Sequence, residues 1–202
     1  MMDKQKMIDE LAASLHAQVE RARQLRTLSE QRLRHRPAQG QWNVLEVFAH
    51  MVLSSGIYER GLRSVFDKKA DALPDAPDFK PGLLGEWFTS GMRPKPGGRI
   101  AWKMKTLKIF DPAKQHGASM ESIDAFIRLC TSLLELLERA RRTDLGRMKV
   151  VSSLGPVIRF KAGDAFRFVV AHQERHFLQI GRLLAAVPPE PAAHPRPVAA
   201  TS

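Results

Sequence analysis

The spacing of core-facing residues in the stretch 163–187 constrains the fold more than any other feature of the sequence. Six residues there recur at alternating intervals of four and three, the pattern of one helix face turned toward a core. They are Ala165, Val169, His172, His176, Gln179 and Leu183. The pattern predicts a last helix that begins at Gly163 or Asp164 and runs to Val187. Two of the seven histidines therefore stand where a helical bundle normally has leucine.

The two histidines of this face lie one helical turn apart. Burial costs each imidazole its hydration, so its N–H and its lone pair both need partners. A divalent metal ion would satisfy the lone pairs of His172 and His176 at once. The H-x-x-x-H spacing is also common by chance, and buried histidines usually find ordinary hydrogen-bond partners. The pair alone leaves a metal site and a structural role open.

Two further amphipathic helices are expected in the first third of the chain. Apolar residues at helical spacing predict the first over residues 3–34, and a segment with Pro and Gly then ends it. The second begins at Asn43, a good N-cap, with Glu46 three residues on in position to close a capping box. It is expected to run to about Asp67.

The connection after the second helix, residues 68–117, is about fifty residues long and rich in Pro and Gly. A short helix is expected near 83–88 and an extended segment near 99–110. Such a length lets the second and third helices run parallel. Ser119 is expected to cap the third helix, and residues 143–162 to form a short hairpin or a plain loop. The elements predict an all-α fold: an up-down-down-up four-helix bundle with a long crossover between helices two and three.

In this arrangement the fourth helix packs against the second. His50 lies on a face of the second helix in one row with Glu46 and Ser54, and it would then face His172 and His176. Three histidines and a water molecule commonly hold a catalytic zinc ion, and nickel or manganese can use the same set. The topology therefore predicts an open three-histidine metal site.

Composition sets limits on the rest of the chain. With 202 residues, 44% of them hydrophobic, one core and one domain over residues 1–187 are expected. Residues 188–202 are rich in Pro and Ala and are expected to be disordered. No segment has the apolar length of a membrane span, so a soluble, cytoplasmic protein is expected. The single cysteine, Cys130, excludes an internal disulfide, and its apolar setting favours a core role over a catalytic thiol.

The formal net charge of +11 favours anionic partners, such as carboxylates, phosphates or nucleic acid. Much of the excess lies in the basic loop 87–110, where basic residues accumulate beside Trp87 and Trp102. These are Arg93, Lys95, Arg99, Lys103, Lys105 and Lys108. Such interleaving can hold nucleic acid through phosphates and stacking, but a solvated basic loop is the favoured interpretation.

Two motifs more than a hundred residues apart carry a resemblance to a known family. The sequence W-N-V-L-E-V-F-A-H at 42–50, followed by H-Q-E-R-H-F-L-Q-I at 172–180, resembles the DinB-like superfamily of bacterial four-helix bundles. Those proteins show Trp-Ser/Thr-x-x-Glu-x-x-x-His at the start of helix two, and His-x-x-x-His followed by Gln-Ile on the last helix. The matching positions are Trp42, Glu46, His50, His172, His176, Gln179 and Ile180, and Asn43 replaces the usual hydroxyl residue.

The resemblance implies a divalent metal ion bound by His50, His172 and His176, with zinc or nickel preferred and manganese as an alternative. Some relatives are S-transferases that use bacillithiol, mycothiol or glutathione, some are isomerases that depend on such thiols, and many have no known activity. The leading expectation is a metal-dependent low-molecular-weight-thiol S-transferase with a small-molecule substrate. The alternative is a non-catalytic, metal-stabilised, stress-related binding module whose basic loop contacts an acidic partner or nucleic acid. Both the enzyme and the binding module are compatible with a homodimer.

Residues around the ligands have more than one interpretation. Glu46 is a candidate to fix the tautomer of His50, although closing the capping box is the favoured role. Gln179 and Arg175 are candidates for the substrate pocket, and Gln179 is equally well explained as a buried polar spacer. Three basic residues are candidates for the carboxylates of a thiol cofactor: Arg99, Lys103 and Lys105.

Overall fold

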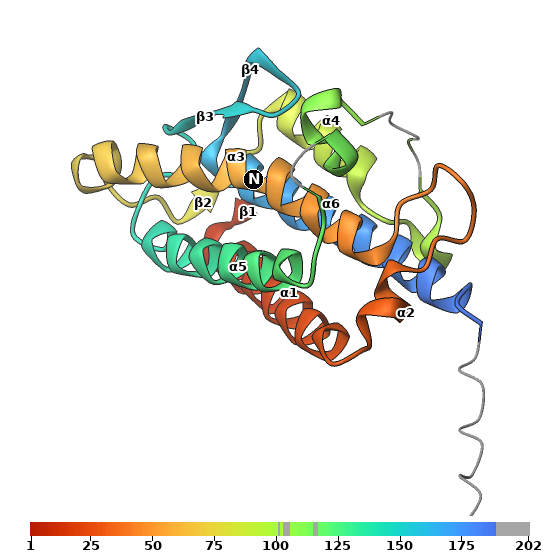
Figure 1. Ribbon diagram of the computed structural model, residues 1–202. Coiled ribbons are helices and arrows are strands. Elements are labelled where there is room, and N and C mark those ends of the chain that lie inside the picture. The colour runs from red at the N-terminus through yellow and green to blue at the C-terminus, as the bar shows by residue number, and fades with distance from the viewer. Residues whose placement is uncertain (101, 103–105, 115–116, 189–202) are drawn as a thin grey trace, which may run out of the picture.

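The structure is a computed structural model that describes residues 1–100, 102, 106–114 and 117–188. It is mostly helical, with two small antiparallel sheets (Figure 1). The α-helices are α1 (Lys4–Arg26), α2 (Glu30–Arg34), α3 (Val44–Lys69), α4 (Leu83–Met92), α5 (Glu121–Ala140) and α6 (Ala162–Ala185). The strands are β1 (Met2–Asp3), β2 (Asp78–Phe79), β3 (Lys149–Ser152) and β4 (Gly155–Lys161). Short 3-10 helices lie at Ala70–Ala72, Pro96–Gly98, Lys108–Phe110 and Pro112–Lys114.

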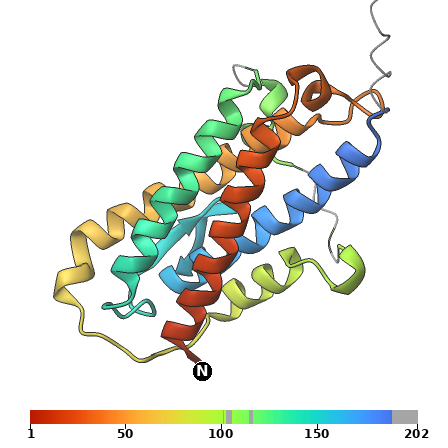
Figure 2. The same cartoon turned by 90° about the horizontal axis from the view of Figure 1, so that it is seen from below.

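The long helices α1, α3, α5 and α6 share one apolar core. Both α1 and α3 contact α5 and α6, and α4 packs along α6 (Figures 1 and 2). At the centre, the ring of Phe177 on α6 lies edge-on to Phe48 of α3 and to Phe126 of α5, with centroids 5.9 and 5.7 Å apart. The mostly helical class is thus confirmed, and α6 lies against α3, as the expected metal site requires.

The start of α3 follows the predicted capping box. The Asn43 side chain accepts a hydrogen bond of 3.0 Å from the backbone N–H of Glu46, and the Glu46 carboxylate accepts one of 2.9 Å from the backbone N–H of Asn43. These reciprocal bonds satisfy donors that the first turn of a helix leaves unpaired. They fix where α3 begins, and therefore the direction in which His50 points nearly two turns later.

Two predictions of helix ends were wrong. The first helix is not continuous over residues 3–34, because α1 ends at Arg26 and the Ser29 side chain caps a separate helix, α2. Ser119 does not cap the third helix, because α5 begins after Met120. The Ser122 hydroxyl instead accepts a hydrogen bond of 3.2 Å from the backbone N–H of Ser119. In both places a serine hydroxyl accepts a hydrogen bond from a backbone N–H near a helix end. The spacing of apolar residues does not reveal such a bond.

The connection between α5 and α6 follows its prediction more closely than the long connection between α3 and α5. The hairpin after α5 is present, with β3 and β4 paired in a register that places Val150 opposite Phe160. Phe160 packs against Tyr58 and Phe168, so the hairpin closes one end of the space between α3 and α6. The short helix α4 extends beyond its predicted end, and the expected extended segment near 99–110 ends in a 3-10 helix.

Some predictions fall on residues outside those that the structure describes. They concern the tail from residue 189 onward and two of the basic residues, Lys103 and Lys105. Within the described residues, no helix combines the length and the apolar character that crossing a lipid bilayer requires.

Candidate metal centre

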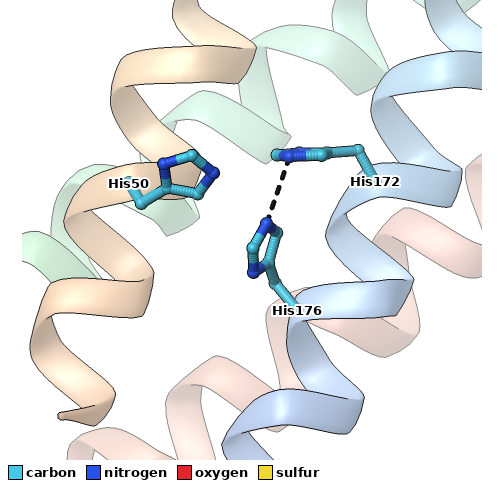
Figure 3. A group of neighbouring side chains, drawn as sticks. All are labelled: His50, His172 and His176. Atoms are coloured by element: carbon cyan, nitrogen blue, oxygen red, sulfur yellow. Dashed lines mark hydrogen bonds between the residues drawn. The ribbon is translucent and has the colours of Figure 1, made fainter. Parts of the chain in front are cut away.

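Three histidines from two helices converge between α3 and α6 (Figure 3). His50 comes from α3, and His172 and His176 come from successive turns of α6. Each ring offers one nitrogen, and these three atoms lie within 4.8 Å of one another. The structure therefore brings together the three residues that the sequence singled out, in a group that could hold a metal ion.

The α6 pair already has the spacing of two ligands on one ion. The Nε2 atoms of His172 and His176 lie 3.1 Å apart. Zn–N bonds of about 2.0–2.1 Å at a tetrahedral angle separate two ligand nitrogens by about 3.3–3.4 Å. Ring shifts on the order of 1 Å would bring His50 to the same separation. The donor set fits a divalent ion of the zinc type.

Outer hydrogen bonds orient two of the rings. Nδ1 of His50 donates to the backbone carbonyl of Phe110 at 2.9 Å, and Nδ1 of His176 donates to Oε1 of Gln179 at 2.9 Å. With the proton held on Nδ1, each ring directs the lone pair of Nε2 toward the shared point. Metal-binding histidines are commonly held in this way by a carbonyl or a carboxylate behind the ring.

Burial keeps the histidines neutral. Desolvation lowers the pKa of His50 below its usual value, against the opposing effects of the Phe110 carbonyl and Asp111. Desolvation also lowers the pKa of His176 to about 3, and it lowers that of His172 well below the usual range, with His176 and His50 adding to the shift. Neutral imidazoles have the lone pair that a metal ion requires, so near neutral pH no proton has to be displaced from a cationic ring.

Glu46 lies where the favoured interpretation placed it. Its carboxylate closes the capping box and accepts a hydrogen bond of 2.6 Å from Nη2 of Arg36. Its hydrogen bonds in the described part of the chain do not include one to His50. The carbonyl of Phe110 occupies the position behind His50 for which Glu46 was a candidate. The sequence contains no signal for this, since a backbone carbonyl sixty residues away has no side-chain signature.

A partly open cavity of about 90 Å³ adjoins the histidines. Its walls include apolar side chains from α6, from the hairpin and from residues 106–110 of the long connection, together with several hydroxyls. Lining residues that the sequence did not point to include Ser55, Tyr58, Leu107, Ser153, Leu154 and Phe168. Tyr58 is held by hydrogen bonds of 2.7 Å to Ser152 Oγ and of 3.1 Å from the backbone N–H of Ser153. The cavity can take a small, largely apolar group beside the ring nitrogens.

The two predicted pocket residues occupy different places. Gln179 supports His176 from behind and lines an open cleft on the outer side of the ring. Arg175 lines both the cavity beside the histidines and this cleft. Gln179 is therefore a partner of a candidate ligand, and Arg175 is the charged residue at the entrance.

Two other groups of interest lie apart from the histidines. Cys130 is fully buried, and desolvation raises the pKa of its thiol, as expected of a core residue. In the basic loop, Arg93, Lys95, Arg99 and Lys108 are exposed. In the same segment, Trp87 and Trp102 pack against each other with centroids 4.3 Å apart, and Trp87 is 57% exposed.

Comparison with known proteins identifies one family. The family model described as the DinB superfamily matches residues 7–180, a range that includes all three histidines. Neither the curated proteins nor the solved structures include a match.

Proposed function

The chain belongs to the DinB superfamily. From that premise we propose that it is a divalent-metal-dependent enzyme whose ligands are His50, His172 and His176. The observation that carries the proposal is the convergence of three ring nitrogens within 4.8 Å beside a cavity. The hydrogen bonds from Nδ1 of His50 to Phe110 and from Nδ1 of His176 to Gln179 support it, because they leave the lone pair of Nε2 on each ring available to a metal ion.

Zinc or nickel is the proposed metal, with manganese as the less favoured alternative. Imidazole suits zinc and nickel, whereas manganese prefers carboxylate and water oxygens. Carboxylates take no part in the three-residue group that the described residues form. The cavity leaves room for further ligands, which distinguishes a catalytic site from a closed structural one.

The proposed reaction is S-transfer from a low-molecular-weight thiol to a small electrophile. A divalent ion at the three imidazoles would act as a Lewis acid that lowers the pKa of a thiol at neutral pH. The thiol loses its proton, its sulfur forms a bond to the electrophilic carbon, and the leaving group departs with the bonding electrons and takes up a proton. Phe168 and Leu154 of the cavity wall exclude water from this exchange, and the ordered hydroxyl of Tyr58 helps to position the substrate.

We also propose the helix topology and the cellular location that the sequence predicts. Residues 1–187 would form a single up-down-down-up four-helix bundle. The contacts of α3 with both α5 and α6, and the long connection before α5, support that arrangement. A cytoplasmic location is supported by the single, buried cysteine and by a reaction that draws on a reduced thiol pool. An experimental structure and cell fractionation would test these points.

Elemental analysis tests the metal site directly. Wild type, His176→Ala and His16→Ala are purified without chelator and offered zinc or nickel; His16 is an exposed histidine of α1 and serves as the matched control. Wild type and the control should each bind about one equivalent, and His176→Ala less than about a tenth. Equal metal content in all three would contradict the proposal. Bacillithiol, mycothiol and glutathione are then screened with a generic electrophile.

A second candidate is a metal-stabilised binding module. The observation that favours it is that the segment 87–110 carries several exposed basic residues together with the exposed ring of Trp87. Binding of DNA or RNA through this surface should weaken steeply as salt rises and should be lost when Lys95, Arg99 and Lys108 are changed to Gln. Nucleic-acid binding that is unchanged in the triple variant would remove this candidate.

A further inference from the structure

Arg175 stands at the junction of two spaces. It precedes His176 on α6 and lines both the partly open cavity beside the three histidines and the neighbouring cleft. Thr106 and His176 are the other residues that both spaces share. Arg175 therefore lies at the boundary between the cleft and the cavity, where a ligand that reaches both spaces would contact its side chain.

The Arg175 guanidinium is half-buried and lacks a counterion among the described residues. Its only polar contact there is with Sδ of Met92, at 3.9 Å, and thioether sulfur is a weak acceptor. Arg167, two turns earlier on the same helix, shows how the fold treats a buried guanidinium elsewhere: it pairs with Glu86 at 2.7 Å and with Asp164 at 3.4 Å. A desolvated cation without a partner costs free energy. Arg175 thus has the properties of a receptor for an anion.

The space around Arg175 indicates which anion it would bind. Guanidinium donates two parallel hydrogen bonds to a carboxylate or a phosphate. Arg182, the other arginine that lines the cleft, is exposed, donates to the carbonyl of Gly98 at 2.8 Å and does not line the cavity, so Arg175 is the one guanidinium that both spaces share. One positive charge matches a carboxylate better than a phosphate dianion. The cavity behind it, about 90 Å³ and walled by apolar and hydroxyl groups, accepts an uncharged end.

We propose that the small molecule handled by the three-histidine site carries a carboxylate, and that Arg175 binds this carboxylate at the entrance while the uncharged end enters the cavity. The inference rests on the proposed function for the identity of the site. It adds the class of ligand, an organic acid with a short uncharged arm, and it makes Arg175 the residue that selects for the acid.

The test compares two probes that differ only in charge, 3-mercaptopropionate and 3-mercaptopropionamide. Dissociation constants are measured by NMR titration on zinc-loaded and on metal-free protein, in the presence of a phosphine reductant. Wild type should bind the acid at least about tenfold more tightly than the amide, as expected for a charge-assisted, partly buried pair. Arg175→Gln should bring the ratio close to one, and Arg175→Lys should retain part of it. Arg142→Gln, at an exposed arginine that lines neither space, should match wild type.

The outcomes separate this inference from the proposed function. An acid-to-amide ratio near one in wild type, or an unchanged ratio in Arg175→Gln, would overturn the carboxylate receptor even if the protein binds metal normally. A protein that takes up no metal but keeps an Arg175-dependent preference for the acid would support the receptor and overturn the metal enzyme. Equal loss of preference in Arg175→Gln and Arg142→Gln would show a general charge effect and would also overturn the inference.

Discussion

The hydrogen bond between Gln179 and His176 gives the most direct test of how the site is built. Gln179→Met keeps the length of the side chain and removes the acceptor of the His176 Nδ1–H bond. Without that acceptor, the proton of the neutral ring is free to move to Nε2, which then cannot bind a metal ion. Loss of such an outer partner typically costs 10–100-fold in metal affinity, or about 1.4–2.7 kcal/mol.

The effect on stability follows from mass action. With free metal at 100 times the wild-type dissociation constant, binding stabilises wild type by about 2.7 kcal/mol. A variant that binds about 30-fold more weakly gains only about 0.9 kcal/mol at the same metal concentration. For a chain of this length, 1 kcal/mol shifts Tm by about 2–4 °C, so the Tm increase caused by metal should be smaller by about 4–7 °C in the variant. The metal-free variant should lose about 1 kcal/mol or less, because Gln179 is only partly buried.

Two measurements check this prediction: metal affinity by competition with a chelator, and thermal unfolding with and without metal. Gln24→Met, at an exposed glutamine of α1, is the control and should behave as wild type. Gln179→Glu keeps an acceptor and should retain affinity. If Gln179→Met bound metal as tightly as wild type while His176→Ala did not bind, the role given to the outer hydrogen bond would be wrong.

Three further predictions concern charge, reactivity and packing. The pKa of His176 is 6.5 in the unfolded chain and is lowered to about 3 in the folded chain. Between these two pH values the unfolded chain binds a proton at His176 that the folded chain does not, so acidification below pH 6.5 lowers the free energy of unfolding. For metal-free protein, His176 alone should make the free energy of unfolding, measured by urea titration, about 2 kcal/mol lower at pH 5 than at pH 7. Equal free energies of unfolding at the two pH values would contradict the burial of His176 as a neutral ring. Cys130, fully buried with a raised thiol pKa, should react with an aromatic disulfide reagent only on unfolding; rapid labelling of folded protein would refute the core assignment. Gly85→Ala should lower the free energy of unfolding by about 1–3 kcal/mol in chemical denaturation, because a Cβ there would lie 2.4 Å from Cγ of Asp164. An unchanged free energy of unfolding would show that α4 can shift to make room for the methyl group.

The sequence predicted the parts of the site that depend on helical periodicity. The spacing of His172 and His176, and the capping box that sets the start of α3, are local patterns, and the structure shows both. The convergence of His50 with the α6 pair required only that α3 and α6 be neighbours. Gln179 also had a signal, because a residue three positions after His176 lies on the same helix face.

The parts that the sequence did not predict depend on irregular chain and on tertiary contact. Phe110 acts through its carbonyl, and its position is set by the long connection, where no periodicity exists to be recognised. The separation of α1 from α2 depends on a serine cap within an otherwise continuous apolar pattern. The cavity lies where Tyr58, Phe168 and the hairpin leave the space between α3 and α6 unfilled, and no pattern in the sequence indicates such a space.

The core and the candidate metal centre are joined by adjacent residues on both helices. Phe177 directly follows His176 and packs against Phe48, which lies two residues before His50, with ring centroids 5.9 Å apart. The same contact that buries these two rings therefore also sets how closely α3 brings His50 to α6. Because packed interiors yield little to small displacements, the distance between His50 and His176 is set by core packing before any ion binds. Metal affinity should consequently depend on core residues that touch no ligand atom, and the three histidines should form a binding site only in the folded chain.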